Sequence, residues 1–330
     1  MQSDQLKRRE FITLLGGAAT WPLAAHAQQP ERIRRIGLLG STVPSGVAGR
    51  LDRFRDGLRD LGYVEGQNIL IDFRWAEADY AKLPELAAEL IRLKVDLLVT
   101  YGTPGTLAAK RATTTVPIVM LVSGDAIATG LITSLARPGG NVTGSTFFDP
   151  ELNAKRLELI KEAFPSAGRI AILVNPDNPV NAADMKAMEQ TAGSLKLELQ
   201  SFEARRLDEL QGLISRVTKA RVDVIAVSSD SVFVGNPGKI AAIAADNRMP
   251  SIGPPEFAQA GGLIGYGVNL SDLWYRGAYF VDKILKGAKP ADLPVEQPTK
   301  FDLVINLKTA KGIGIDIPTT MLARADNVIE

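Results

Sequence analysis

Short apolar runs alternate with helical stripes along most of the chain. The runs fit buried strands at residues 33–39, 69–75, 95–101, 117–122, 169–174, 196–202, 222–227, 263–267 and 301–306. Between them, apolar residues recur at the spacing of an amphipathic helix, as Leu51, Phe54 and Leu58 do. This spacing predicts helices at residues 51–61, 83–91, 104–112, 152–164, 181–195, 207–219, 236–246 and 270–286.

Strands that alternate with helices predict parallel sheets with helices on both faces. The pattern restarts in the middle of the chain, so the expected fold class is α/β with two doubly wound lobes. If the helix at 270–286 returns to the first lobe and the last residues return to the second, the chain crosses between the lobes three times and forms a hinge beside a cleft. The expected lobes are then residues 28–147 with 268–298, and residues 148–267 with 299–330.

Residues 1–27 have the pattern of an export signal. Arg8 and Arg9 precede a mild apolar run at 12–25, which is too short to span a membrane. An Ala-His-Ala cleavage site ends at Ala27. The paired arginines resemble a bacterial twin-arginine signal, and an ordinary Sec signal with the same cleavage is the alternative. A soluble periplasmic protein without stable membrane insertion is expected once the leader is removed.

Composition narrows the chemistry that the chain can perform. With 38 basic and 37 acidic residues, the protein has no net field to attract nucleic acid. There is no cysteine, and the one histidine, His26, lies in the leader. Disulfides, thiolate nucleophiles and a Ser-His-Asp triad are therefore excluded from the mature chain, and we expect no metal site, no cofactor and no enzymatic activity. An enzyme that uses carboxylates remains the alternative.

Candidate ligand contacts in the first lobe lie in loops that follow strands, because doubly wound sheets bind ligands beyond the carboxyl ends of their strands. The first such loop holds Ser41 and Thr42, and a later one holds Tyr101, Thr103 and Thr106. Their hydroxyls, with the free N–H groups of a helix start, could bind a carboxylate. The alternative for each hydroxyl is to cap the following helix, as Thr103 would cap a helix that begins at the next residue.

Further candidates are carboxylates and amides at strand ends. Asp125 could hold a ligand ammonium group or cap the segment that follows it. In the second half of the chain, Asn175, Asn178, Asp230 and Ser231 occupy equivalent positions, where turn formation is the structural alternative.

Two more residues near strand ends have a possible role. Phe233 follows Asp230 and Ser231 closely and could cover a ligand. Glu256 is also near a strand end, and there we expect an exposed glutamate at a helix start.

Several segments together resemble the substrate-binding proteins of ABC transporters, of the tryptophan/tyrosine type. They are residues 125–131, 137–144, 175–176, 229–231 and 261–267. The second of these, Arg-Pro-Gly-Gly-Asn-Val-Thr-Gly, is the most specific. The resemblance spans nearly all of the mature chain. It implies a type I periplasmic-binding-protein fold, in which two Rossmann-like lobes trap a ligand and deliver it to the membrane subunits of an ABC permease.

The resemblance also implies a monomer with ligand contacts in the loops named above. Members that bind aromatic amino acids need rings to stack on the ligand, and here these could come only from Tyr101, Phe147, Phe148 or Phe233. The expected ligand is an amino acid or a related small organic acid. Its carboxylate would lie at the helix start of residues 103–106 and any ammonium group at Asp230 or Asp125. A ligand-sensing module for a membrane receptor is a further alternative.

Overall fold

The computed structural model describes residues 33–330, so the predicted leader, its paired arginines and its cleavage after Ala27 lie outside the described residues. None of the helices within residues 33–330 combines the length and the apolar character that crossing a bilayer requires.

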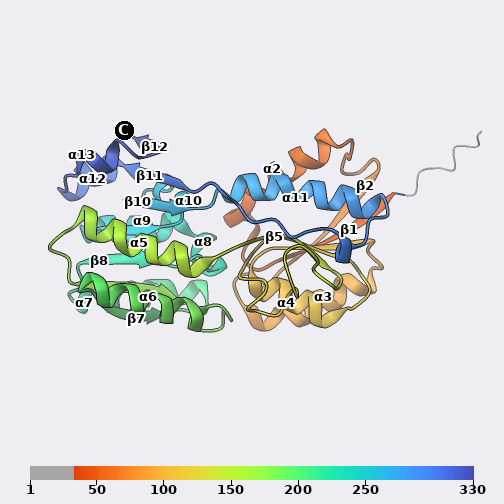
Figure 1. The fold of residues 1–330 in the computed structure, drawn as a ribbon, viewed down its shortest axis with the longest axis horizontal. Helices are drawn as coiled ribbons and strands as arrows, with labels where there is room; N and C mark the ends of the chain where they lie inside the picture. Colours follow the sequence, from red (N-terminus) through yellow and green to blue (C-terminus); the bar gives the residue numbers. More distant parts are fainter. Residues whose placement is uncertain (1–32) are drawn as a thin grey trace, which may run out of the picture. The chain divides into compact units, whose positions relative to one another are not determined.

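The first lobe is built on a sheet of five parallel strands in the order β2-β1-β3-β4-β5 (Figure 1). Its strands are β1 (Arg34–Gly40), β2 (Ile69–Trp75), β3 (Leu97–Thr100), β4 (Ile118–Gly124) and β5 (Val142–Phe147). Its helices are η1 (Pro44–Val47), α2 (Ala48–Asp60), η2 (Tyr80–Lys82), α3 (Leu83–Arg92), α4 (Thr103–Ala112), α11 (Leu270–Leu285) and η4 (Pro290–Asp292). Helices α2 and α11 pack together on one face, and α3 and α4 pack together on the other.

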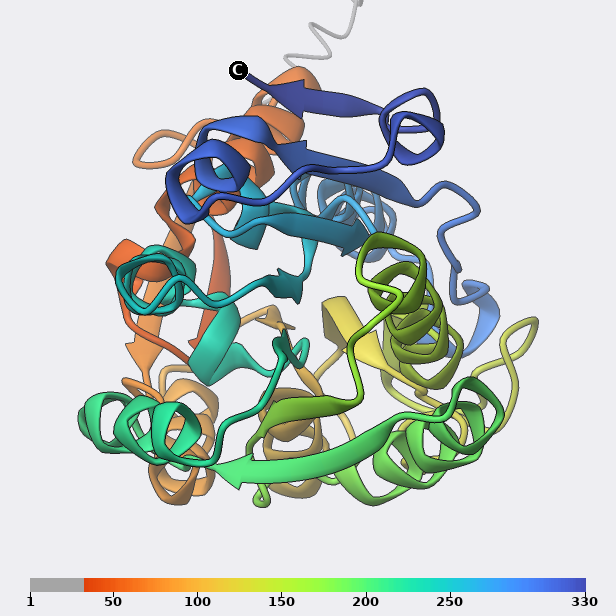
Figure 2. The ribbon, with the colours of Figure 1, turned by 90° about the vertical axis from the view of Figure 1, so that its left-hand side faces the viewer.

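The second lobe is built on a sheet of seven strands in the order β12-β11-β10-β9-β8-β6-β7, parallel except where β11 runs against β10. Its strands are β6 (Arg169–Val174), β7 (Glu198–Glu203), β8 (Val224–Val227), β9 (Ser251–Gly253), β10 (Ile264–Gly267), β11 (Asp302–Asn306) and β12 (Asn327–Ile329). Its helices are α5 (Asp149–Ala163), α6 (Asn181–Leu195), η3 (Leu207–Glu209), α7 (Leu210–Lys219), α8 (Ser231–Val234), α9 (Pro237–Asp246), α10 (Pro255–Gln259), α12 (Leu307–Ile313) and α13 (Thr319–Leu322). Figure 2 shows α5 and α6 on one side of this sheet and α7 and α9 on the other.

The chain crosses between the lobes three times. It leaves the first sheet after Phe147, returns after Gly267, and leaves again between Glu296, which pairs with Ser145 of β5, and Asp302 at the start of β11. In Figure 1, α11 in blue lies with the orange and yellow elements of the first lobe, although it directly follows β10 in the chain. The fold class expected from the sequence, two doubly wound α/β lobes joined by three crossings, is confirmed.

The hydrophobic pattern of the sequence did not predict strand β5. Strand β5 has the sequence Val-Thr-Gly-Ser-Thr-Phe and is buried along its whole length, yet it contains no apolar run. A small residue is required where β4 lies closest to this strand. A Cβ at Gly144, where φ is 129°, would lie 2.0 Å from the carbonyl oxygen of Met120 on β4. The short elements β9, β12, α8, α10, α12 and α13 also went unpredicted, because so few residues show no period.

Candidate functional site

A cavity of ≈ 50 Å³ lies between the carboxyl ends of the strands of both lobes. Its polar lining includes Thr42, Arg50, Tyr101, Gly102, Thr103, Ser123 and Gly124 from the first lobe, and Arg156, Asn178, Ser229, Ser231 and Gly235 from the second. Apolar side chains complete the wall: Val47, Val122, Phe147, Leu152, Val180, Val234, Pro254, Val268 and Leu270. One water needs roughly 10–15 Å³ of such space, so the cavity accepts a small guest.

The first-lobe wall, formed by the loops after β1, β3 and β4, is held by hydrogen bonds within its own lobe. Ser41 Oγ donates to the carbonyl oxygen of Tyr101 at 3.1 Å, and the Thr42 N–H donates to the Tyr101 hydroxyl at 3.1 Å. Burial raises the pKa of Tyr101 to about 12, so its hydroxyl keeps its proton at neutral pH. Thr42 Oγ1 is buried and has no hydrogen-bond partner among the described residues, which leaves it for a ligand.

The threonines of the second candidate loop differ in what they reach. Helix α4 begins at Thr103 itself, after Gly102 at a φ of 73°, so the expected cap by Thr103 on a helix starting one residue later is wrong. Thr103 Oγ1 instead accepts from the Gly124 N–H at 3.1 Å and lines the cavity. Thr106 Oγ1 bonds to Thr100 Oγ1 at 2.9 Å and donates to the Gly102 carbonyl, and Thr106 does not line the cavity.

The second-lobe wall contains a buried network centred on Asp230. Its carboxylate accepts from Asn175 Nδ2 at 3.3 Å, from Asn178 Nδ2 at 2.9 Å and from the Val232 N–H at 2.9 Å. Burial raises the pKa of Asp230, and the hydrogen bonds that it accepts oppose this rise. The Asp230 carboxylate therefore links the loops that carry Asn175, Asn178 and Val232 by hydrogen bonds.

The predicted ligand residues of the second lobe divide between two places. Asn178 and Ser231 line the main cavity, whereas Asn175 and Asp230 line a smaller one of ≈ 10 Å³ beside it, which Asn178 shares.

Asp125 and Ser41 lie off the cavity wall. The Asp125 carboxylate accepts from the N–H groups of Ile127 and Ala128, so the structure assigns it the capping alternative. Of the ten candidate residues, the structure thus brings five together on the wall: Thr42, Tyr101, Thr103, Asn178 and Ser231. Ser41 lies behind these five residues and donates a hydrogen bond to the carbonyl oxygen of Tyr101.

Two arginines on the wall were missed by the sequence reasoning. Arg50 lies on α2 of the first lobe, and its Nη2 donates to the carbonyl oxygens of Gly46 at 2.7 Å and Val234 at 3.2 Å. Arg156 lies on α5 of the second lobe and is 2% exposed. The signal for Arg156 was a basic residue between Leu152 and Ile160, in the apolar stripe of a helix.

Glu256 was expected to be exposed, and this expectation is wrong. Its side-chain atom Oε2 is buried without a hydrogen-bond partner among the described residues. Burial raises the pKa of Glu256, and the charges of Arg50 and Arg156 oppose that rise. Glu256 therefore lies within electrostatic reach of both arginines, although it does not line the cavity itself.

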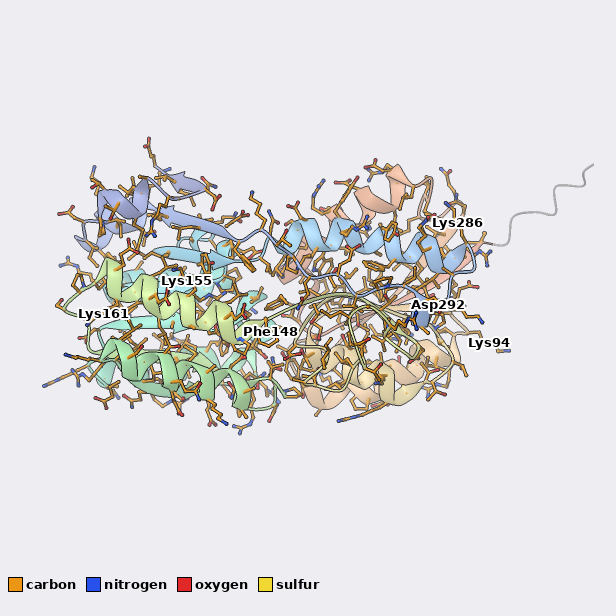
Figure 3. All side chains as sticks on the ribbon, in the orientation of Figure 1. Lys94, Phe148, Lys155, Lys161, Lys286 and Asp292 are labelled. Carbon is orange, nitrogen blue, oxygen red and sulfur yellow. The ribbon has the colours of Figure 1, made fainter. Side chains whose placement is uncertain are left out.

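The four rings considered for stacking are placed differently. Tyr101 and Phe147 line the cavity. Phe233 is fully buried in a core cluster of the second lobe, away from the cavity lining. Phe148 is 42% exposed and lies at the junction between the lobes in Figure 3. Only the first two can contact a guest in this arrangement.

The loop after β2 joins the first lobe to the second. Glu77 and Ala78 adopt φ values of 56° and 64°, which are uncommon for residues other than glycine. This backbone brings Ala78 into a core cluster of the second lobe and places the Tyr80 hydroxyl 3.0 Å from both carboxylate oxygens of Asp230. The lobes are therefore in direct contact, and the Tyr80 hydroxyl completes the network around Asp230.

Glycines allow the lobes to approach closely at the mouth of the cavity. A Cβ at Gly46 would lie 2.2 Å from the carbonyl oxygen of Gly235, and a Cβ at Gly102 would lie 2.7 Å from Ser231 Oγ. Each of these contacts joins the first lobe to the second. The structure is thus a closed arrangement in which any side chain at Gly46 would collide with the opposite lobe.

Within residues 33–330, no group of three or more acidic or histidine side chains lies close enough together to hold a metal ion. The wall offers hydroxyls, an amide, backbone groups and two guanidinium groups. Groups of these kinds can form hydrogen bonds with a polar molecule.

Comparison with known proteins agrees with this geometry. The sequence pattern of the family described as "ABC transporter substrate binding protein" matches residues 46–329. A tyrosine-binding protein of Clostridioides difficile (strain R20291) is 29% identical over 268 residues, which are 80% of this chain and 77% of that protein.

Two solved structures help to define the conformational state. The ABC domain from Streptococcus pneumonia in complex with L-Trp has a TM-score of 0.81 at 28% identity, covering 90% of this chain and 99% of that one. The ligand-free, open structure of a substrate-binding protein with adhesive properties from Clostridium difficile has a TM-score of 0.61 at 26% identity, covering 90% and 99%. The chain is thus more similar to the ligand complex than to the open form, in keeping with the contacts between its lobes.

Proposed function

Because the chain belongs to the ABC transporter substrate-binding protein family, we propose that it captures a small organic ligand in the periplasm and delivers it to the membrane subunits of an ABC permease. The proposed ligand is an amino acid or a related small organic acid. Two of the similar proteins named above bind tyrosine or L-Trp.

The observation that carries this proposal is the cavity with one wall from each lobe. A ligand that touches both walls gains its full set of contacts only when the lobes are closed. It therefore binds the closed state more tightly than the open state and shifts the population toward closure. Closure by hinge rotation around such a site is a known mode of ligand capture.

Delivery to a permease explains why a binding protein closes without transforming its guest. A permease that docks only on the closed form would receive only loaded protein. Export to the periplasm is supported by the leader pattern of residues 1–27 and by the family match. A catalytic role has no comparable support, because the described wall carries neither a nucleophile beside a base nor a paired acid and base.

The test combines ligand binding with closure. Mature protein, residues 28–330, is screened against amino acids and small organic acids by thermal shift, and compounds that bind are taken to small-angle scattering. We expect a ligand to raise the melting temperature and to reduce the radius of gyration. Product formed on prolonged incubation, or binding without any change in the scattering curve, would contradict the proposal.

Delivery is tested separately in cells. Deleting the gene should abolish uptake of the radiolabelled ligand, and the wild-type gene on a plasmid should restore it. Restored uptake from a copy that lacks residues 1–27 would contradict a periplasmic role.

A further inference from the structure

The cavity wall carries positive charge from both lobes and no negative charge. Arg50 and Arg156 line it, and no aspartate or glutamate is among the described residues that do. The two nearby carboxyls, Asp230 and Glu256, lie behind the wall. A guest in the cavity therefore meets two guanidinium groups directly.

Both arginines donate hydrogen bonds to neutral acceptors that orient their side chains. Arg156 Nε donates to the carbonyl oxygen of Tyr266 at 2.9 Å, and its Nη1 donates to Asn153 Oδ1 at 3.0 Å and to Ser229 Oγ at 3.3 Å. Arg50 donates to two backbone carbonyls, and its guanidinium lies 5.9 Å from the centre of the Trp274 ring. These contacts orient the side chains, and both stay charged at physiological pH.

Asp230, the carboxylate that could have bound an ammonium group, already accepts hydrogen bonds from groups of the protein. Asp230 accepts from Tyr80, Asn175, Asn178 and Val232. Burial raises the pKa of both Asp230 and Glu256, and the charges of Arg50 and Arg156 oppose the rise for Glu256. An ammonium group in the cavity would face two cations without touching a carboxylate.

Resting on the proposed function, we infer that the cavity selects a small organic anion without an ammonium group, whose carboxylate is held by Arg50 and Arg156. Planar guanidinium groups match the geometry of a carboxylate and hydrogen-bond it strongly. The remainder of the anion is apolar, because Val47, Phe147, Leu152 and Val268 line the same cavity. Since the two arginines come from different lobes, the anion is bound fully only on closure.

The test uses two series of compounds that differ only in charge. The aliphatic series is 3-methylbutanoate, L-valine and isobutylamine, and the aromatic series is 3-phenylpropanoate, L-phenylalanine and 2-phenylethylamine. Calorimetry on the wild-type mature protein should find that in at least one series the acid binds at least tenfold more tightly than the amino acid, and that the amine does not bind.

Variants of the two arginines test whether these side chains bind the carboxylate of the acid. Arg156→Gln and Arg50→Gln should each weaken binding of the acid by roughly 10- to 100-fold, because each loses a charge-assisted hydrogen bond. Lys155→Gln and Arg53→Gln are the matched controls, since they remove a positive charge from exposed positions on the same two helices (Lys155 is labelled in Figure 3). These controls should bind like the wild type. Arg156→Lys keeps the charge if the glutamine variant fails to fold, and it should retain part of the affinity.

The outcomes separate this inference from the proposed function. An amino acid that binds as tightly as its acid, or tighter, overturns the inference and leaves the proposed function standing. So does closure around an uncharged or cationic solute when no acid binds. If neither these compounds nor a broad metabolite panel changes the melting temperature or the scattering curve, the proposed function fails as well.

Discussion

The two walls of the cavity are made by similar folds and use different chemistry. In the first lobe, the hydroxyls of Ser41, Thr103 and Thr106 are bonded to groups of the same lobe. In the second lobe, Asp230 and Arg156 organise a buried charged network. The first wall presents hydroxyls that are bonded within its own lobe, with Arg50 as its charged side chain, whereas the second wall takes a partner for Asp230, Tyr80, from the opposite lobe.

This difference indicates how binding is shared between the lobes. The hydroxyls of the first wall that are bonded within their own lobe keep their partners in the open state. The network around Asp230 receives the Tyr80 hydroxyl only when the lobes close, so its hydrogen bonds differ between the open and the closed state. Four sets of substitutions test this difference between the lobes.

Preventing the walls from meeting should have the largest effect. Gly46→Ala places a methyl group 2.2 Å from the Gly235 carbonyl oxygen in the opposite lobe. Overpacking of this kind costs about 1–3 kcal/mol, so ligand affinity should fall by roughly 5- to 100-fold. Calorimetry and small-angle scattering measure the two consequences. Gly49→Ala is the control, because nothing lies within 4 Å of a Cβ there; equal affinities in the two variants would contradict a steric role for Gly46.

Removing the bond between the walls should have the next largest effect. Tyr80→Phe deletes the hydroxyl that lies 3.0 Å from the Asp230 carboxylate and leaves the ring in place. A hydrogen bond to a charged group contributes about 1.5–3 kcal/mol. Because water hydrates both groups in the open state, we expect ligand affinity to fall by only about tenfold. The unfolding transition should change less than the dissociation constant. An unchanged affinity would show that Tyr80 does not link closure to binding.

The internal bonds of the first wall should affect stability and leave binding unchanged. Thr106→Val removes a buried hydroxyl that bonds to Thr100 and Gly102. The free energy of unfolding should fall by about 1–2 kcal/mol, and ligand affinity should stay the same. Urea unfolding and calorimetry on one preparation make the comparison. A loss of affinity at full stability would place Thr106 in the ligand site after all.

The smallest effect expected is a difference in pH dependence between the lobes. Burial raises the pKa of Asp230, so its contribution to stability is complete below the ordinary aspartate value of about 3.9 and is lost as the pH rises through the raised value. Asp230→Asn should remove this fall. In the first lobe, the hydrogen bond from Arg35 lowers the pKa of Asp72, so its contribution is present above about 3.9 and is lost as the pH falls.

Chemical unfolding between pH 3 and pH 8 checks both substitutions. Asp72→Asn should weaken the loss of stability in acid, and Asp230→Asn should weaken the loss toward neutral pH. The same change of slope in both variants would contradict the contrast between the lobes.

The sequence predicted the elements whose pattern is long and periodic. Strand β2, strand β6 and helix α6 have the bounds expected from periodicity alone. The two lobes followed from the alternation of strands and helices, and the three crossings were a conditional expectation that the family resemblance also implied. Strand β5 was missed because its small polar residues are explained by contact with β4, which is not visible in a local pattern.

The sequence predicted the loop residues of the candidate site, and it did not predict the helix residues on the wall. The positions that follow strands identified Thr42, Tyr101, Thr103, Asn178 and Ser231 on the wall. Arg50 and Arg156 lie within helices, where a basic residue usually faces solvent. The partner of Asp230 is Tyr80, which is distant in the chain, and only the folded arrangement brings them together.

The route of the chain also sets an order of assembly. Helix α11 covers the sheet of the first lobe, and β11 and β12 extend the sheet of the second, yet all three belong to the last part of the sequence. A ribosome-bound chain that ends before residue 270 therefore lacks one of the two helices that cover a face of the first sheet, and it lacks one edge of the second sheet. Both halves mature late and nearly together, so a nascent polypeptide exposes apolar surface to chaperones until synthesis is almost finished.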